Sequence, residues 1–532
     1  MPPTLSTEIL VIGGGATGLG AAWDAALRGY KTLLVEKGDL THGTSGRYHG
    51  LLHSGARYVV RDPQSAADCA RENARLKRLM PSAIEDTGGF FVALDEDPPD
   101  YIDPFVQGCA AAGIAATEVT PAEARRVEPL LTDRLARAFY VPDAACDSFD
   151  AAHLVSAGIT AAGGEVWLRH RLVRLLVEGG RVTGAELERL TDGERRTVLA
   201  DLVLNCTGAW AGQVAALAGC EVRVTPGKGT MVAMNYRLVN RVLNRLKPPS
   251  DGDILVPVGT VAVIGTTDIK VENPDQYAIE PWEIELLMAE GAKLLPRFRE
   301  FRALRAWAGV RPLYDAAKAG QPAESRTMTR AHAILDHAAR DGVEGFISVV
   351  GGKFTTFRQM AEEAVDLAGR KLGTERPCTT AATPLEPPIT RHHVLRARLA
   401  ASEVYPRPAL VCECELVTRD AVTAALQRSQ SPVLNDLRRD LRLGMGPCQA
   451  GFCAVRAAAL MHAGREPEPP AAESNSTLLE FLQERWKGLR PVMWGANLRQ
   501  MELDQNIYRN LLGADRLPTA RPPETYPTEK TA

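Results

Sequence analysis

At 532 residues the chain is long enough for about two to four domains, because single hydrophobic cores rarely grow beyond about 250–300 residues. A formal net charge of −3 implies no strongly basic surface, which argues against nucleic acid as a partner. No apolar run approaches the roughly 20 residues of a membrane-spanning helix, so any contact with a membrane is expected to be peripheral.

The N-terminal segment has the pattern of a dinucleotide-binding unit. Its glycine motif, Gly13-x-Gly15-x-x-Gly18, permits a tight turn and lets a helix N-terminus approach a pyrophosphate. Glu36 follows at the place where an acidic side chain hydrogen-bonds a ribose. A strand over residues 8–12, a helix over 19–28 and a strand over 31–35 flank these positions. This context favours a nucleotide site over a purely structural glycine turn.

Three later segments favour FAD over NAD. Residues 41–58, THGTSGRYHGLLHSGARY, suit a loop lying along an isoalloxazine ring. A buried strand pattern ends at Thr207-Gly208, and another over 346–350 leads into Gly351-Gly352-Lys353 and a helix over 355–367, whose positive end would face a reduced flavin. A one-piece NAD domain would need none of these segments. The predicted cofactor-binding residues here are Thr44, Ser45, Gly208, Gly352, Lys353, Phe354 and Thr355.

These segments predict a discontinuous FAD domain within residues 1–375, an α/β fold with a Rossmann-type core. It would use roughly residues 1–85, 145–215 and 340–375, and the residues between them would form a substrate domain. Strand patterns at 231–233, 254–258 and 261–265 and a helical pattern at 281–295 predict an antiparallel sheet covering the reactive face of the flavin.

The C-terminal third is predicted to be a separate module. A linker over 376–409, which includes the proline-rich stretch 383–389, leads to a cysteine module over 410–463. A second proline-rich linker, Gly464 to Ser476, begins the last part, 464–532, whose helical tail would pack on the protein or bind another subunit.

Four cysteines in this module, Cys412-x-Cys414 and Cys448-x4-Cys453, are spaced so that their thiolates can converge on one iron–sulfur cluster. Zinc is the alternative, although structural zinc sites favour Cys-x2–4-Cys knuckles. A disulfide is a weaker interpretation, because no secretion signal is recognised and a reducing compartment is expected. The remaining cysteines are expected to be small buried apolar residues: Cys69, Cys109, Cys146, Cys206, Cys220 and Cys378.

Several segments, in the same order, resemble the large catalytic subunit of anaerobic glycerol-3-phosphate dehydrogenase, a flavoprotein of the D-amino-acid-oxidase-like class. The resemblance runs from about residue 9 to about residue 512, and its C-terminal module resembles the helical [2Fe–2S] domain of bacterioferritin-associated ferredoxins. The matching segments are GGGATG, RYHGLLHSGARY, KPPSDGDILVP, GVRPL, GGKFTTFRQMAE, the stretch from Val411 to Cys453, and ERWKGLRPVMWG.

The resemblance implies oxidation of sn-glycerol 3-phosphate to dihydroxyacetone phosphate by FAD. The family's phosphate-binding arginines match Arg57, Arg311 and Arg330, and Lys353 matches a lysine beside the flavin. Planar guanidinium groups suit a phosphate dianion, although a surface ion pair is the alternative for Arg311 and Arg330. Lys353 would hold the substrate or favour the anionic reduced ring.

His53 is the predicted proton acceptor, because imidazole titrates near neutral pH and its loop should face the flavin. His49 is the second candidate, and a hydrogen bond that shapes the loop is the alternative role for either histidine.

Electrons would then pass through the iron–sulfur cluster and partner subunits toward membrane quinone, which implies a cytoplasmic protein held peripherally at the inner face of the cell membrane. Two other functions stay open. An FAD-dependent dehydrogenase of a hydroxy or amino acid would need a carboxylate clamp and fewer positive groups. A non-enzymatic redox sensor would not need the substrate motifs.

Overall fold

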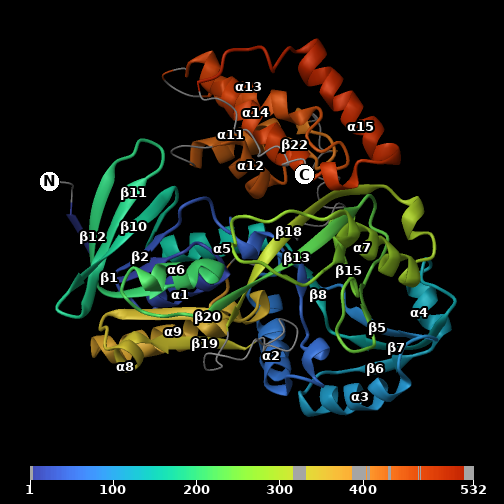
Figure 1. Ribbon diagram of the computed structural model, residues 1–532, viewed down its shortest axis with the longest axis horizontal. Coiled ribbons are helices and arrows are strands. Elements are labelled where there is room, and N and C mark those ends of the chain that lie inside the picture. The colour runs from blue at the N-terminus through green and yellow to red at the C-terminus, as the bar shows by residue number, and fades with distance from the viewer. Residues whose placement is uncertain are drawn as a thin grey trace.

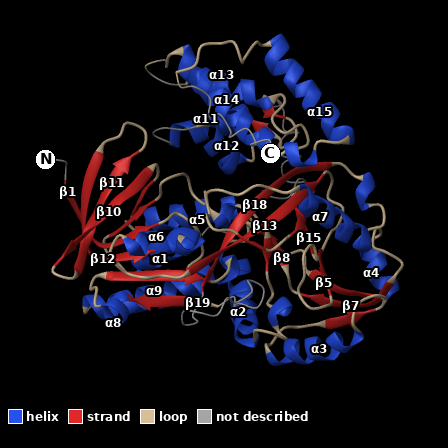
Figure 2. Ribbon diagram, viewed as in Figure 1, coloured by secondary structure: helices blue, strands red, loops and turns tan. Residues whose placement is uncertain are grey.

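The computed structural model describes residues 4–314, 331–385, 403, 408–428, 433–464, 467 and 469–520. Two large sheets lie next to each other, and the C-terminal helices form a separate layer across them (Figure 1). Figure 2 shows that this layer is almost entirely helical, whereas the rest of the chain mixes helices and strands.

The first sheet has eight strands in the order β10-β11-β12-β1-β2-β9, with β20 beside β12 and β19 beside β20. Neighbours from β9 through β2, β1 and β12 to β20 are parallel, and the outer strands β10, β11 and β19 are antiparallel. The strands are β1 (Thr4–Ile12), β2 (Thr32–Val35), β9 (Glu165–Trp167), β10 (His170–Glu178), β11 (Arg181–Arg189), β12 (Arg195–Asn205), β19 (His332–Asp336) and β20 (Phe346–Gly351).

Both faces of the central parallel strands are buried, as is usual for such strands, whereas β10 and β11 carry exposed residues. Along β1, Ile9 and Val11 join the core under helices α1 (Ala16–Leu27), α5 (Ser148–Ala161) and α9 (Phe357–Leu372). Leu10 and Ile12 join the opposite core, which includes α6 (Ala211–Ala216). The strands and helices predicted around the glycine motif and before Gly351 are confirmed. Helix α1 begins three residues earlier than expected, inside the glycine motif itself.

The second sheet has nine strands in the order β17-β13-β16-β15-β14-β5-β7-β6, with β18 on β13. All neighbours are antiparallel except β14 and β5. Helix α7 (Pro281–Leu294) packs on it, so the predicted helix and the three predicted strands are confirmed. The strands are β5 (Gly89–Leu94), β6 (Thr117–Val119), β7 (Leu135–Val141), β13 (Val224–Met234), β14 (Val242–Arg245), β15 (Ile254–Val258), β16 (Val261–Gly265), β17 (Ile269–Lys270) and β18 (Ala303–Tyr314).

Shorter elements complete the catalytic part. A small three-stranded sheet has the order β3 (Leu51–Leu52), β8 (Ala144–Cys146) and β4 (Ile84–Glu85). Along the chain, β3 and β4 lie between β2 of the first large sheet and β5 of the second. The remaining helices are α2 (Pro63–Leu79), α3 (Ile102–Ala111), α4 (Pro121–Val127) and α8 (His337–Asp341).

The C-terminal module has its own core, to which Cys412, Cys453, Phe481 and Tyr508 contribute. The last helices pack on this core. Its elements are β21 (Leu410–Cys412), β22 (Val417–Thr418), α11 (Arg419–Arg428), α12 (Leu434–Leu441), α13 (Cys453–Ala463), α14 (Ala471–Lys487) and α15 (Gly495–Gln505), followed by a π-helical segment, Asn506–Leu511.

The predicted linker from Gly464 to Ser476 is wrong in its second half. Helix α14 begins at Ala471, directly after Pro470, and Glu473 lies in its first turn. Proline can precede a helix without blocking it, and an acidic residue in the first turn favours the helix dipole. Proline therefore marks the start of a helix here.

The module docks on both sheets. Ion pairs join Arg439 to Asp39 at 2.7 Å and Arg442 to Asp147 at 2.8 Å. On the other side, the backbone N–H of Ala306 in β18 donates to the Gly488 carbonyl, 2.8 Å away. Among the described helices, none combines the length and apolar character needed to cross a bilayer.

Candidate active site

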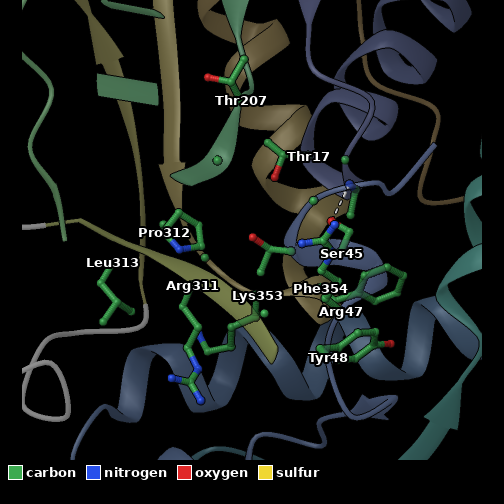
Figure 3. A pocket seen from close by; sticks show the side chains of 18 of the residues that line it. Thr17, Ser45, Arg47, Tyr48, Thr207, Arg311, Pro312, Leu313, Lys353 and Phe354 are labelled. Atoms are coloured by element: carbon green, nitrogen blue, oxygen red, sulfur yellow. Dashed lines mark hydrogen bonds between the residues drawn. The ribbon is translucent and has the colours of Figure 1, made fainter. Parts of the chain in front are cut away.

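A cavity of about 1140 Å³ lies between the two sheets. It is lined by the glycine motif and Glu36 from the first sheet, by loop residues 42–58, by β18 from the second sheet and by residues 351–355. Figure 3 shows part of this lining, with Thr17 and Ser45 near the glycine motif and Arg311 and Lys353 lower in the view. The segments predicted to meet one cofactor thus line one cavity.

The glycine turn is so tight that side chains do not fit at two of its positions. Gly13 has φ +111°, and a Cβ there would lie 2.7 Å from the Cys206 carbonyl oxygen. A Cβ on Gly18 would lie 1.9 Å from the Gly13 carbonyl oxygen. Helix α1 begins after Gly15, and its Ala16 N–H donates to Ser45 Oγ at 3.0 Å. Its first turn has no acidic residue, so its positive end suits a pyrophosphate.

Glu36 directly follows β2 and lies beside the same turn. Its Oε2 accepts from the Gly14 N–H and its Oε1 from the Gly38 N–H, both at 2.7 Å. Burial raises the pKa of this carboxyl, and the two backbone bonds oppose the shift. Each carboxylate oxygen has a second lone pair that can accept from a ribose hydroxyl. The ribose contact itself stays a prediction.

We expect Gly18→Ala and Gly15→Leu to separate two roles of the motif. Overpacking of the Gly18 kind costs about 1–3 kcal/mol of folding free energy, so Gly18→Ala should lower the melting temperature of the cofactor-free protein. At Gly15 a Cβ would meet only Ser45 Oγ, 3.3 Å away, so Gly15→Leu should fold normally but obstruct the pyrophosphate. Flavin absorbance per chain and the melting temperature without cofactor measure the two effects. Full cofactor content in Gly15→Leu would contradict this assignment.

Two of the predicted phosphate-binding arginines, Arg57 and Arg311, line the cavity from different elements, and each is held by a carboxylate. Arg57 Nη2 lies 2.8 Å from Asp253 Oδ1 and 2.9 Å from Oδ2. Arg311, on β18, donates from Nη1 to Asp268 Oδ1 at 2.8 Å and from Nη2 to the Thr267 carbonyl at 2.9 Å. Their side chains are only 14% and 24% exposed. The ion pair considered for Arg311 therefore exists, but it orients the guanidinium at the cavity. Arg330 lies outside the described residues.

The loop with the histidines is fixed to the segment after β20. The backbone N–H of His53 donates to Thr355 Oγ1 at 3.1 Å. The ring of Tyr48 stacks on Phe354 with centroids 5.3 Å apart, and Lys353 Nζ lies 4.8 Å from the centre of the Tyr58 ring. His53 and Lys353 both line the cavity.

His49 has a different electrostatic setting. Burial, and then the charges of Arg311 and Arg57, lower its pKa to about 3. The Leu51 N–H donates to its Nδ1 at 3.2 Å, so the neutral ring carries its proton on Nε2. With the Nδ1 lone pair engaged and Nε2 protonated, His49 is placed as a hydrogen-bond donor rather than as a proton acceptor.

The remaining predicted cofactor residues also line the cavity: Thr44, Ser45, Gly208, Gly352, Phe354 and Thr355. Thr44 Oγ1 donates to the Val310 carbonyl at 2.5 Å, which ties its loop to β18. Sequence reasoning missed Asp253 and Asp268, the carboxylates that orient the arginines. Asp253 lies in the matching segment KPPSDGDILVP, but no local pattern pairs it with Arg57.

The four cysteine thiols of the module act on one another, most strongly within two pairs. The thiols of Cys412 and Cys453 form one pair, and those of Cys414 and Cys448 form the other. The Cys414 thiol, followed by the backbone N–H groups of Phe452, Gly451 and Ala450, lowers the pKa of Cys448 to about 6. Sulfur atoms that accept backbone N–H bonds are usual in iron–sulfur proteins, where such bonds tune the potential.

No three of these four sulfurs lie within 4.8 Å of one another. In the described part of the chain, three or more potential ligand atoms lie within 4.8 Å of one another only at Cys220, His337 and Asp341. There the two ring nitrogens of His337 already contact Asp341 and Ser348. Of the other cysteines predicted to be buried, Cys69, Cys109, Cys146, Cys206 and Cys220 are buried and Cys378 is half-buried.

Comparison with known proteins places this site in context. Residues 8–366 match the family model described as FAD dependent oxidoreductase. One subunit of anaerobic glycerol-3-phosphate dehydrogenase from Haloferax volcanii is 40% identical over 546 residues, which cover 97% of this chain and 92% of that protein. The corresponding subunit of the anaerobic enzyme from Escherichia coli K12 is 40% identical over 537 residues, covering 96% of this chain and 98% of that protein.

Solved structures share the fold at lower identity. The glycerol-3-phosphate dehydrogenase of Bacillus halodurans, complexed with FAD, superposes with a TM-score of 0.58 at 20% identity, covering 96% of this chain and 94% of that one. Glycine oxidase from Geobacillus kaustophilus superposes with a TM-score of 0.57 at 20% identity, covering 73% of this chain and all of that one.

Proposed function

Because the chain belongs to the FAD-dependent oxidoreductases and, within them, to the family of the anaerobic glycerol-3-phosphate dehydrogenases, we propose that it oxidises sn-glycerol 3-phosphate to dihydroxyacetone phosphate. The family and the D-amino-acid-oxidase-like fold expected from the sequence are both confirmed. FAD is accordingly the cofactor, and the tight glycine turn with its uncompensated helix N-terminus fits the pyrophosphate of FAD.

One observation carries the substrate assignment: Arg57 and Arg311, each braced by a carboxylate, line the same cavity as the glycine turn. A phosphate dianion needs fixed positive charge, and braced guanidinium groups supply it with little loss of side-chain entropy on binding. Lys353 lines the same cavity and is proposed to add a third positive charge at the substrate.

The FAD, when bound, accepts the hydride from carbon 2 of the substrate. The protein then has to orient the substrate, exclude water and receive the hydroxyl proton. His53 is proposed as the proton acceptor, and the Nε2–H of His49 as a donor to the substrate or to the cofactor. Arg57 and Arg311 hold the phosphate.

We expect His53→Gln to lower kcat by about 10²–10⁴-fold with a smaller change in KM, because general base catalysis contributes this much. His49 has a pKa of about 3, so it stays neutral above about pH 5 and is not the source of any loss of activity between pH 5 and 7. The kcat/KM profile of His49→Gln should keep the shape of the parent profile over this range. If the pH profile changed shape in His49→Gln while His53→Gln had little effect on kcat, His49 would be the proton acceptor and His53 the hydrogen-bonding residue.

The FAD is expected to be bound noncovalently. Burial raises the pKa of Cys206, a thiol at the cavity wall, to about 12, so it is not a nucleophilic thiolate. Acid precipitation should release the yellow colour into the supernatant. Flavin that stays in the washed pellet would show a covalent bond, and His49 and His53 would then be the first candidates for its attachment.

The cysteine module is proposed to hold a [2Fe–2S] cluster. Two pairs of thiols match two irons with two thiolates each. A single zinc ion with bonds of about 2.3 Å would need all four sulfurs about 3.8 Å apart, and the sulfurs are not gathered in this way. Electrons would then leave the flavin through this cluster toward partner subunits and membrane quinone.

The substrate assignment is tested by anaerobic reduction of an artificial acceptor with purified protein. Glycerol 3-phosphate is compared with lactate, 2-hydroxyglutarate, proline and hydroxyproline at equal concentration. We expect glycerol 3-phosphate to give the largest kcat/KM. A preference for a carboxylate substrate would favour a hydroxy- or amino-acid dehydrogenase, and absence of turnover with all of them would favour a redox sensor.

A further inference from the structure

Three arginines meet at the junction between the catalytic part and the cysteine module. Arg305 lies on β18, Arg438 on α12 and Arg485 on α14. All three line a second cavity of about 2040 Å³. It shares His42, Arg47, Tyr48 and His49 with the first cavity, but Arg57 and Arg311 line only the first. Figure 1 shows that β18 faces the layer of C-terminal helices that contains α12 and α14.

Arg485 is buried and Arg305 and Arg438 are half-buried, and the hydrogen-bonding capacity of all three is poorly satisfied. Arg485 is 2% exposed; its Nη2 donates to Gln449 Oε1 at 2.7 Å, and its Nε is buried without a hydrogen-bond partner. The Nε of Arg305 is buried without a partner as well. The hydrogen bond of Arg438 is a long one, 3.4 Å from Nε to Asn435 Oδ1. Within the described chain, none of the three forms an ion pair.

Three other arginines that line the same cavity form ion pairs, whereas Arg47 donates to the Tyr277 hydroxyl at 3.0 Å. Arg439 pairs with Asp39 at 2.7 Å, Arg442 with Asp147 at 2.8 Å and Arg169 with Asp436 at 2.5 Å. Glu484 is the carboxylate whose charge acts on all three arginines, and the same carboxylate is paired with Lys487. The junction therefore contains more buried positive charge than its carboxylates neutralise.

The three charges act on one another. Burial, then the charges of Arg439 and Arg305, lower the pKa of Arg438 to about 9. Burial, then Arg305 and Arg438, lower the pKa of Arg485 well below its usual value. Guanidinium groups nevertheless remain protonated in proteins, so an enclosed group of three needs a counter-charge that these side chains do not provide.

We propose that Arg305, Arg438 and Arg485 bind a small oxyanion of the phosphate class at the junction between the catalytic part and the cysteine module. A tetrahedral dianion offers several acceptor oxygens to planar guanidinium forks, and it meets the unpartnered Nε–H groups. Because the arginines come from β18 on one side and from α12 and α14 on the other, the anion bridges the two parts and stabilises the docked module.

Equilibrium dialysis of the FAD-loaded full chain against radiolabelled inorganic phosphate, at constant ionic strength, tests this site. We expect two phosphates per chain, one at Arg57 and Arg311 and one at the junction. Arg311→Gln should lose the first, and Arg305→Gln combined with Arg438→Gln should lose the second. Arg174→Gln combined with Arg195→Gln, which also removes two positive charges but from exposed positions on β10 and β12, should lose neither. One phosphate per chain in the parent protein, released by Arg311→Gln, would overturn the proposal.

Competition identifies the source of the phosphate group. Glycerol 3-phosphate is added to the Arg311→Gln variant at the same concentration as the bound inorganic phosphate. Displacement of the phosphate indicates a phosphate-ester site. Failure to displace it indicates a site for the inorganic ion. Arg485 is left unchanged because it contacts Gln449 in the cysteine loop.

A second measurement covers variants that fold poorly. Ligand that binds the native state raises the melting temperature. Two proteins are compared: the Arg311→Gln variant and the double variant Arg311→Gln with Arg438→Lys. Phosphate should raise the melting temperature of the first by more than that of the second, because lysine keeps the charge but lacks the planar fork. Equal responses to phosphate in these two proteins would also overturn the proposal.

Discussion

Arg311→Gln should reduce kcat/KM for glycerol 3-phosphate by at least about thirtyfold, because loss of a charged hydrogen-bonding partner of this kind costs on the order of 2–5 kcal/mol. The proposed contact is to the phosphate, so use of unphosphorylated glycerol should change much less. The measured quantity is the ratio of the two kcat/KM values, parent against variant, in the same acceptor assay.

The control for Arg311 must account for Asp268, which would lose its ion-pair partner in a largely buried place. The double variant Arg311→Gln and Asp268→Asn removes both charges and should show the same change in substrate ratio. Arg311→Lys keeps a charge without the fork and should recover only part of the loss. A drop below about tenfold, or an equal loss for both substrates, would contradict phosphate binding by Arg311.

Cys414→Ser should remove the proposed cluster while leaving the flavin site intact. Anaerobically prepared parent protein is expected to contain about two irons and two labile sulfides per chain in addition to FAD, and the variant neither iron nor sulfide. Cys414 and the glycine turn belong to different cores, so FAD content and bleaching of the flavin by substrate should persist. Electron transfer to the physiological acceptor should suffer most.

Cys378→Ser is the matched control, since Cys378 is half-buried like Cys414 but lies outside the module. It should keep iron, sulfide and FAD. Stoichiometric zinc without iron in anaerobically isolated parent protein would contradict the cluster proposal. The module would then be a structural zinc domain, and the electron route through it would have to be abandoned.

The sequence predicted the elements whose signals are local. A glycine motif between strand and helix depends on backbone conformation within a few residues, so Gly13, Gly15 and Gly18 could be placed before the structure was known. The four cysteines were found for the same reason, because ligand spacing is a local pattern. The end of the second proline-rich linker was misplaced because proline is compatible both with a linker and with the start of a helix.

The sequence by itself thus determined the family, the cofactor motif and the candidate ligands and arginines. Only the tertiary structure decided how these groups are braced. Arg57 meets Asp253 because the loop after β3 lies beside the start of β15, and Arg311 meets Asp268 because β18 and β17 both pair with β13; the separations are 196 and 43 residues. The group of Arg305, Arg438 and Arg485 exists only because the module docks on β18. Contacts of this kind depend on packing between distant elements, and no local pattern encodes which charge finds which partner.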